Sequence, residues 1–237
     1  MQKNKFWLNN FMVAKAVVWA IVLMSFFRAS SWAGNQGNGN WSIDVQSGGA
    51  YNFPVPLHFR QGSYDKKITA DYSTRPFGGG AAPYYSIRVR KNISENESLG
   101  FEWLHHKLWL DNRPAEVAEF RMTFGYNPML FTYFRRMLPW LIVYAGVGPV
   151  IAHPVNTVNG KKLADSPKLW PTGHRYEFVG AGMDVGAEAF YFVSENFFLN
   201  TDIKSTYSYA WSIPLVDGNA KTHQASLHFH LGVGASW

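Results

Sequence analysis

Acidic, basic and imidazole side chains recur at short spacings in two segments of the chain. Glu102, His105 and Lys107 lie close together, and Asp202 and Lys204 form a second acid and base pair. A carboxylate beside an imidazole or an amine is the combination that general acid–base catalysis uses. Imidazoles and carboxylates together can also bind a divalent metal. These five residues are therefore the candidate catalytic residues.

A second interpretation is that these side chains are salt-bridged filler and carry no chemistry. The other histidines that could join them, His58, His153, His174 and His223, are expected on or near one rim of the fold. Residue spacing alone does not give ligand geometry. The metal ligands are therefore unknown at this stage, and a divalent ion is the cofactor to be tested.

The chain ends in a segment in which apolar and polar residues alternate. From Leu227 to Trp237 the odd-numbered residues are apolar, and the even-numbered residues are histidine, glycine or serine. This alternation is typical of a transmembrane β-strand with one face toward lipid and the other toward a barrel interior. We expect this strand to close an outer-membrane barrel and to be the segment that the barrel-assembly machinery engages.

Seven further segments alternate in a similar way. With the last strand, the set is 42–53, 84–91, 99–110, 119–135, 141–153, 176–193, 197–213 and 222–237. The connections between these segments alternate along the chain between short ones and ones that are mostly longer. Outer-membrane barrels alternate in the same way between short periplasmic turns and long extracellular loops. The sequence therefore predicts an all-β fold, an eight-stranded antiparallel transmembrane β-barrel in the outer membrane of a Gram-negative bacterium. The long first connection is expected to contain a hairpin of 57–61 with 68–72.

Parity also predicts which side chains fill the barrel. The alternation breaks after Trp103, and a β-bulge near Leu104 would restore it, so that His105 and Lys107 point inward. The predicted interior consists of Asp44, Arg88, Arg90, Glu102, His105, Lys107, Glu119, Arg121, Asp184, Glu188, Asp202, Lys204, His228 and His230. A barrel of eight strands has space only for packed side chains. We therefore expect a filled ionic network and no diffusion channel.

The first 33 residues have the features of a secretory signal. A lysine-containing start precedes an apolar run that is too short to span a bilayer as a helix, and small residues surround the expected cleavage after Ala33. The barrel domain is then 34–237. Four of the 22 basic residues belong to the signal, which leaves 18 basic against 16 acidic residues. No basic stripe for nucleic acid is left, and the absence of cysteine excludes disulfides and thiol nucleophiles.

Five segments occur in the order found in one family of small barrels: 82–88, 100–109, 124–127, 144–153 and 202–208. The strongest elements are acid-x-x-His-x-Lys, from Glu102 to Lys107, and acid-x-Lys-x-x-Tyr, from Asp202 to Tyr207. Together they resemble the small eight-stranded outer-membrane barrel family that includes the rhizobial lipid A oxidase.

This resemblance implies an oxygen-dependent oxidation of the proximal glucosamine of lipid A, with lipid A or lipopolysaccharide as the partner and a divalent cation involved. The five candidate catalytic residues then form the site. Arg121, Lys161 and Lys162 are the candidate contacts to the lipid A phosphates. The alternative is a non-enzymatic barrel of the OmpA or OmpX type, with a structural or adhesive role. The sequence leaves both open, and with them whether the protein is an enzyme.

Overall fold

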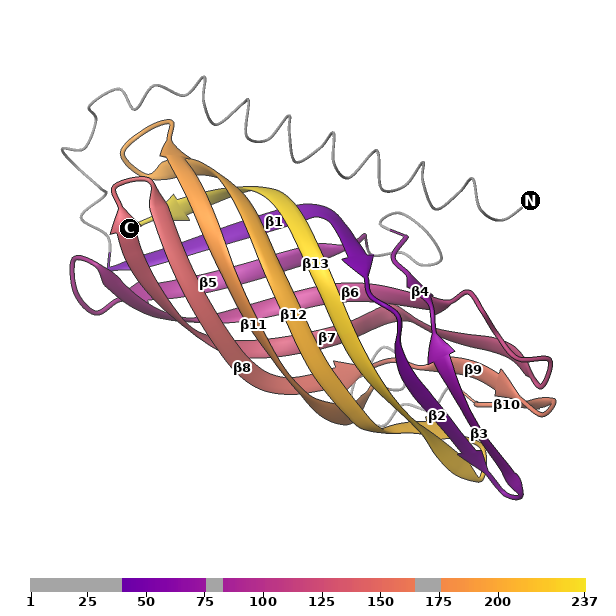
Figure 1. Ribbon diagram of the computed structural model, residues 1–237. Helices are drawn as coiled ribbons and strands as arrows, with labels where there is room; N and C mark the ends of the chain where they lie inside the picture. Colours follow the sequence, from indigo (N-terminus) through magenta and orange to yellow (C-terminus); the bar gives the residue numbers. More distant parts are fainter. Residues whose placement is uncertain (1–39, 76–82, 165–175) are drawn as a thin grey trace. The chain divides into compact units, whose positions relative to one another are not determined.

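Antiparallel strands form a closed ring in the computed structural model, which describes residues 40–75, 83–164 and 176–237. The eight strands of the ring are β1 (Trp41–Asn52), β5 (Tyr85–Asn92), β6 (Glu97–Leu110), β7 (Val117–Leu138), β8 (Leu141–Ala152), β11 (Glu177–Phe192), β12 (Phe197–Leu215) and β13 (Gly218–Ser236). Each strand pairs with the next, and β13 returns to pair with β1 (Figure 1). The predicted fold class is confirmed. The predicted signal, 1–33, lies outside the described residues.

Five short strands continue the sheet beyond one end of the barrel. They are β2 (Val55–Gln61), β3 (Tyr64–Ala70), β4 (Tyr72–Ser73), β9 (Val155–Val158) and β10 (Lys161–Lys162). The β2–β3 hairpin pairs with β13, and β9 pairs with β7 (Figure 1). The hairpin expected in the first connection is confirmed, but its second strand starts earlier than the predicted 68–72, because Leu57 pairs with Ile68 and Gln61 with Tyr64.

The connection between β12 and β13 is a tight turn, although the sequence predicted a loop. Leu215 pairs with Gly218, and Asp217 in the turn has a φ of 57°. Pro214 suggested that the strand had ended, since proline cannot donate to a β-ladder. In the structure β11 pairs with β12 only as far as Ala210. Pro214 therefore lies at a strand edge where no ladder bond is lost.

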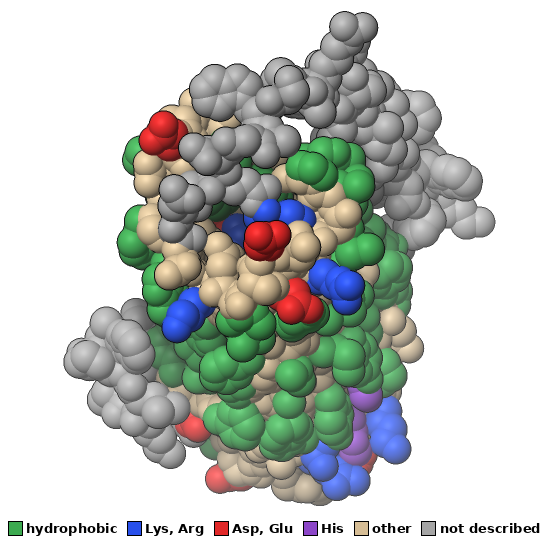
Figure 2. Space-filling view, turned by 90° about the vertical axis from the view of Figure 1, so that its left-hand side faces the viewer, with side chains coloured by type: hydrophobic (Ala, Val, Ile, Leu, Met, Phe, Trp, Pro, Cys, Tyr) green, Lys and Arg blue, Asp and Glu red, His purple; other side chains and the backbone are tan. Residues whose placement is uncertain are grey.

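The outer face of the ring carries a band of exposed apolar side chains (Figure 2). It includes Ile43, Val45, Leu99, Phe131, Val147, Met183, Val185, Ile203, Leu231 and Val233. A closed barrel with such a band, short turns at one end and longer extensions at the other is the architecture of outer-membrane proteins. The protein is an outer-membrane β-barrel, with the extensions on the extracellular side. No described residues form a helix long and apolar enough to cross a membrane.

The interior changes character along the barrel axis. The periplasmic half holds buried charged residues, whereas the extracellular half holds an apolar core. This core includes Leu57 and Phe59 of β2, Leu108 of β6, Phe120 of β7 and Ile213 of β12. The extensions therefore share one hydrophobic core with the extracellular ends of the ring strands.

Candidate functional site

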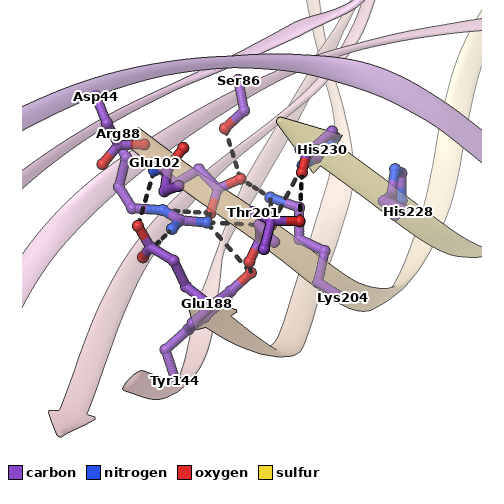
Figure 3. A network of polar contacts seen from close by, with 12 residues as sticks. Asp44, Ser86, Arg88, Glu102, Tyr144, Glu188, Thr201, Lys204, His228 and His230 are labelled. Atoms are coloured by element: carbon purple, nitrogen blue, oxygen red, sulfur yellow. Dashed lines mark hydrogen bonds and ion pairs between the residues drawn. The ribbon is translucent and has the colours of Figure 1, made fainter. Parts of the chain in front are cut away.

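Arg88 is at the centre of the polar interior, and none of its surface is exposed. Its guanidinium lies 2.9 Å from a carboxylate oxygen of Glu188 and 3.1 Å from one of Glu102 (Figure 3). Asp202 is 3.6 Å away. Because Arg88 belongs to β5 and the acids to β11, β6 and β12, these contacts connect four strands across the lumen.

Two more cations complete this network. Arg90 lies 2.7 Å from Asp44 and 2.8 Å from Glu188, and Lys204 contacts Glu102. All of these side chains are buried. Opposite charges at such distances offset the cost of removing each ion from water. The predicted ionic filling is confirmed for the periplasmic half of the lumen, and the predicted pairing of Lys204 with an acid is confirmed.

The predicted interior positions of His228 and His230 are also confirmed. The hydroxyl of Tyr84 lies 2.5 Å from Nδ1 of His228 and 2.6 Å from Nε2 of His230. Nδ1 of His230 lies 3.2 Å from Asp202, which joins this group to the ion-pair network. Both histidines are therefore bound by other interior side chains, as the filler interpretation expects.

The extracellular half of the lumen is not the polar chamber that the sequence predicted. Glu119 and Arg121 were expected to point inward, but Phe120 and Met122 occupy the core instead. Arg121 forms an ion pair with Glu119, with 2.6 Å between Nε and Oε1, and both side chains are about one-third exposed. The barrel extends past the membrane here, so the outer face meets water and the inner face supplies the apolar core.

The register of β6 with β7 shifts between His106 and Leu108, but the extra residues are on β7, between Met122 and Tyr126. The alternation therefore stays regular from Glu102 to His106, with Glu102 inward and His105 outward. On β6 the even-numbered residues stay inward as far as Leu110, so Lys107 has the same outward parity as His105. The prediction that His105 and Lys107 point into the lumen is wrong, because it assumed a bulge near Leu104 that β6 does not have.

The five candidate catalytic residues are consequently not brought together. Glu102, Asp202 and Lys204 belong to the ion-pair network inside the barrel, whereas His105 lies on the opposite side of the barrel wall. No single substrate group can contact both sets across a closed sheet. The acid-x-x-His-x-Lys element is therefore divided between two faces of one strand.

His105 is held between an aromatic ring and an amide on the outer wall. Its ring stacks on Tyr85, with centroids 4.9 Å apart and an interplanar angle of 14°. Its Nδ1 lies 2.9 Å from Oδ1 of Asn127, and Nε1 of Trp103 donates to the same oxygen at 3.1 Å. We call His105, Tyr85, Asn127 and Trp103 the outer-wall site.

Asn127 fixes the tautomer of His105. The amide nitrogen of Asn127 donates to the backbone carbonyl of Ile151 at 3.1 Å, so Oδ1 is the atom that faces His105 and Trp103. This oxygen only accepts hydrogen bonds, so Nδ1 of His105 carries the proton and Nε2 keeps a lone pair. Nε2 is buried and has no hydrogen-bond partner within the described part of the chain. An oriented imidazole with a free Nε2 is the arrangement of a general base.

Gly125 makes space for this amide. A Cβ atom at position 125 would lie 2.3 Å from Oδ1 of Asn127, and the φ of 116° at Gly125 also favours glycine. The carbonyl of Gly125 accepts a hydrogen bond from the backbone of His153 at 3.0 Å. The ring of His153 lies 4.8 Å from that of Phe124 and 5.5 Å from that of Tyr176. The outer-wall site thus adjoins further rings: Phe124 within β7, His153 just after β8 and Tyr176 just before β11.

The family resemblance implies a divalent cation, and the described residues do not fit one. No three histidine, aspartate or glutamate side chains among them are grouped to hold a metal ion. Nε2 of His105 is a single donor, whereas protein metal sites generally use three or more. We therefore assign no step to a metal.

The three candidate phosphate contacts bind acids elsewhere or are exposed. Arg121 is paired with Glu119, Lys161 lies 2.9 Å from Asp217, and Lys162 is exposed on β10. None of these ion pairs belongs to the outer-wall site.

Asn127 and Tyr85 are the site residues that sequence reasoning missed. Both lie in segments that carried the family resemblance, but they were treated as parts of the wall. A signal was present, because Asn127 is a polar residue at an outward parity and follows a glycine by two positions. An amide on a lipid-facing surface is costly unless another group bonds to it.

No family model and no curated protein matches the chain. Among solved structures, it is similar to Ail, the attachment invasion locus protein of Yersinia pestis, at 14% identity, covering 84% of this chain and 99% of that chain with a TM-score of 0.39. OprG of Pseudomonas aeruginosa is 11% identical, with 86% of this chain and 99% of that chain covered and a TM-score of 0.45. The outer membrane protein AlkL is 16% identical, with 89% of this chain and 95% of that chain covered and a TM-score of 0.42. Similarities at this level carry no argument about function.

Proposed function

We propose that this outer-membrane barrel modifies lipid A at the outer-wall site. One observation carries the proposal: His105 is buried and oriented by Asn127, and its Nε2 has no partner among the described residues. A buried polar atom without a partner costs about 1–3 kcal/mol, and a hydroxyl of a bound substrate would remove that cost. The site is at the extracellular end of β5, on the side of the wall that faces the outer leaflet, where lipid A is the resident lipid.

The reaction that the resemblance suggests is oxidation at C1 of the proximal glucosamine. In this reaction the O–H and C1–H bonds of a free C1 hydroxyl break and a lactone carbonyl forms, while dioxygen takes up the two electrons and two protons and leaves as hydrogen peroxide. A base must remove the hydroxyl proton. His105 fits the role of base because Asn127 holds the Nδ1 proton and directs Nε2 away from itself. The same bond stabilises the imidazolium that forms when Nε2 takes the proton. The lumen residues Glu102, Asp202 and Lys204 have no role in this step and hold the barrel together.

The test is mass spectrometry of lipid A from aerobic Gram-negative cells whose lipid A has a free C1 hydroxyl, and which express the protein and are supplied with divalent metal. The wild-type protein should change the mass of lipid A, and His105→Asn should abolish the change while the barrel still folds. His223→Asn is the matched control. His223 is also on the outer wall, but it belongs to β13, contacts Tyr207 of β12 and lies away from the outer-wall site. Unmodified lipid A with the wild-type protein contradicts the proposal, as does full activity of His105→Asn.

A non-enzymatic structural or adhesive barrel is the second candidate. The observation that favours it is the extracellular extension, in which paired strands share the apolar core and carry ion pairs such as Lys161 with Asp217. Deleting the gene should then change envelope permeability or surface adhesion while leaving lipid A unaltered.

A further inference from the structure

A row of basic side chains crosses three strands on the extracellular side of the barrel. The register places Lys221 of β13 opposite His58 of β2, and His58 opposite Lys67 of β3. Leu57 and Phe59, which flank His58, are buried in the apolar core. Because alternate residues of a strand face opposite sides, Lys221, His58 and Lys67 share the outer face. We call these three residues the basic row.

The basic row lies just beyond the aromatic edge of the lipid-facing band. On the outer face of β12 and β13, Tyr209 pairs with His223 and their rings stack with centroids 4.8 Å apart. Tyr207 is 45% exposed below them, and its hydroxyl lies 2.6 Å from His223. Aromatic girdles mark the membrane interface. Lys221 precedes His223 by two residues, about 7 Å along the strand, which is the level of the lipid headgroups.

The acid on this face is already neutralised. Asp65 lies 2.7 Å from Nε2 of His58 and 3.3 Å from Nε of Arg60, and the hydrogen bond from His58 lowers the pKa of Asp65. None of the ion pairs between described residues involves Lys67 or Lys221. Figure 2 shows histidine and basic side chains gathered beyond the hydrophobic band. Positive charges grouped on one sheet face destabilise it unless an anion binds them.

We propose that the basic row binds a phosphate group of a lipid A molecule in the surrounding outer leaflet. Two strand spacings separate Lys221 from Lys67, about 10 Å, so both flexible ammonium groups can reach one phosphate that lies over His58. Phosphate accepts several charge-assisted hydrogen bonds at once. The acyl chains would then lie along the apolar band below Tyr209. The basic row lies at the level of the lipid headgroups, and this position favours lipid A over a soluble polyanion.

This binding site is separate from the outer-wall site. In the ring, β1 and β5 lie between β13 and β6. The inference therefore does not depend on chemistry at His105, and it holds equally for a non-enzymatic barrel.

The test measures binding of lipid A to the purified protein in phosphatidylcholine nanodiscs. The double variant Lys67→Gln with Lys221→Gln removes two charges and keeps polar, unbranched side chains that are only slightly shorter. Each basic residue near an anionic lipid surface contributes about 1 kcal/mol, so the double variant should bind bisphosphorylated lipid A about 30-fold more weakly. Lys91→Gln with Arg135→Gln removes the same charge at the periplasmic end and should change the affinity less than twofold.

Lipid A without phosphate groups should bind the wild-type protein and both double variants equally weakly. Equal affinity of the wild-type protein for lipid A with and without phosphate overturns the proposal. Unchanged lipid A binding by the folded Lys67→Gln and Lys221→Gln double variant also overturns it. The same holds if this variant loses the binding of a soluble sulfated glycan but still binds lipid A. Lipid A modification in cells reports on the outer-wall site alone, so the two proposals fail independently.

Discussion

Replacing Arg88 with methionine tests whether the interior network holds the barrel together. Methionine keeps an unbranched but shorter side chain and cannot pair with Glu102, Glu188 or Asp202, which lie 2.9–3.6 Å from the guanidinium. All of these side chains are fully buried, so no water can replace the lost cation. Breaking a buried ion pair typically costs about 3–5 kcal/mol. We expect the free energy of unfolding to fall by that amount.

The assay is urea unfolding of the protein in lipid vesicles, with heat-modifiable gel migration as the check for folding. Arg60→Met is the matched control, because its ion pair with Asp65 is exposed; exposed pairs are worth about 0–1 kcal/mol. A loss below about 1 kcal/mol for Arg88→Met, equal to the control, would refute the network's structural role.

Three further outcomes are expected. Gly125→Ala should displace the amide of Asn127 and abolish lipid A modification in a barrel that still folds; retained modification would contradict the role of that amide. Tyr84→Phe should lower the free energy of unfolding by about 1–3 kcal/mol, because two buried imidazole nitrogens lose their partner, and denaturant titration checks this. The pKa of Asp65, measured by NMR, should lie below the ordinary aspartate value of about 3.9 and should rise in His58→Ala. The contact between Asp65 and His58 stabilises the β2–β3 hairpin above that ordinary value, and this stabilisation is lost as the pH falls through the lowered pKa.

The ring strands and most of the lumen could be predicted from the sequence. In the membrane, lipid requires an apolar outer face, and the narrow lumen requires polar residues to pair, so parity alone places Arg88 and Lys204 inside. Outside the membrane this rule reverses. Glu119 and Arg121 face water on the outside, and parity gives no sign of where the membrane ends.

The candidate site could be predicted only in part. His105 was identified by its residue type, but its direction was inferred from a bulge near Leu104 that β6 does not contain. Because a one-residue shift moves a side chain to the other face, that bulge reversed the predicted direction. The partner that orients His105, Asn127, is on the next strand. Only the register of β6 with β7 brings the two together, and the sequence alone does not give that register.

The adjacent histidines of β6 provide the most direct test of the account. His105 faces outward beside Asn127, and His106 faces inward, where its ring lies 5.0 Å from that of His228. Lipid A should be analysed by mass spectrometry from cells that express the wild-type protein, His105→Asn or His106→Asn, each confirmed as folded by its gel migration. We predict that His105→Asn abolishes the mass change and that His106→Asn retains it. Loss with His106→Asn and retention with His105→Asn would place the chemistry in the lumen and contradict the account.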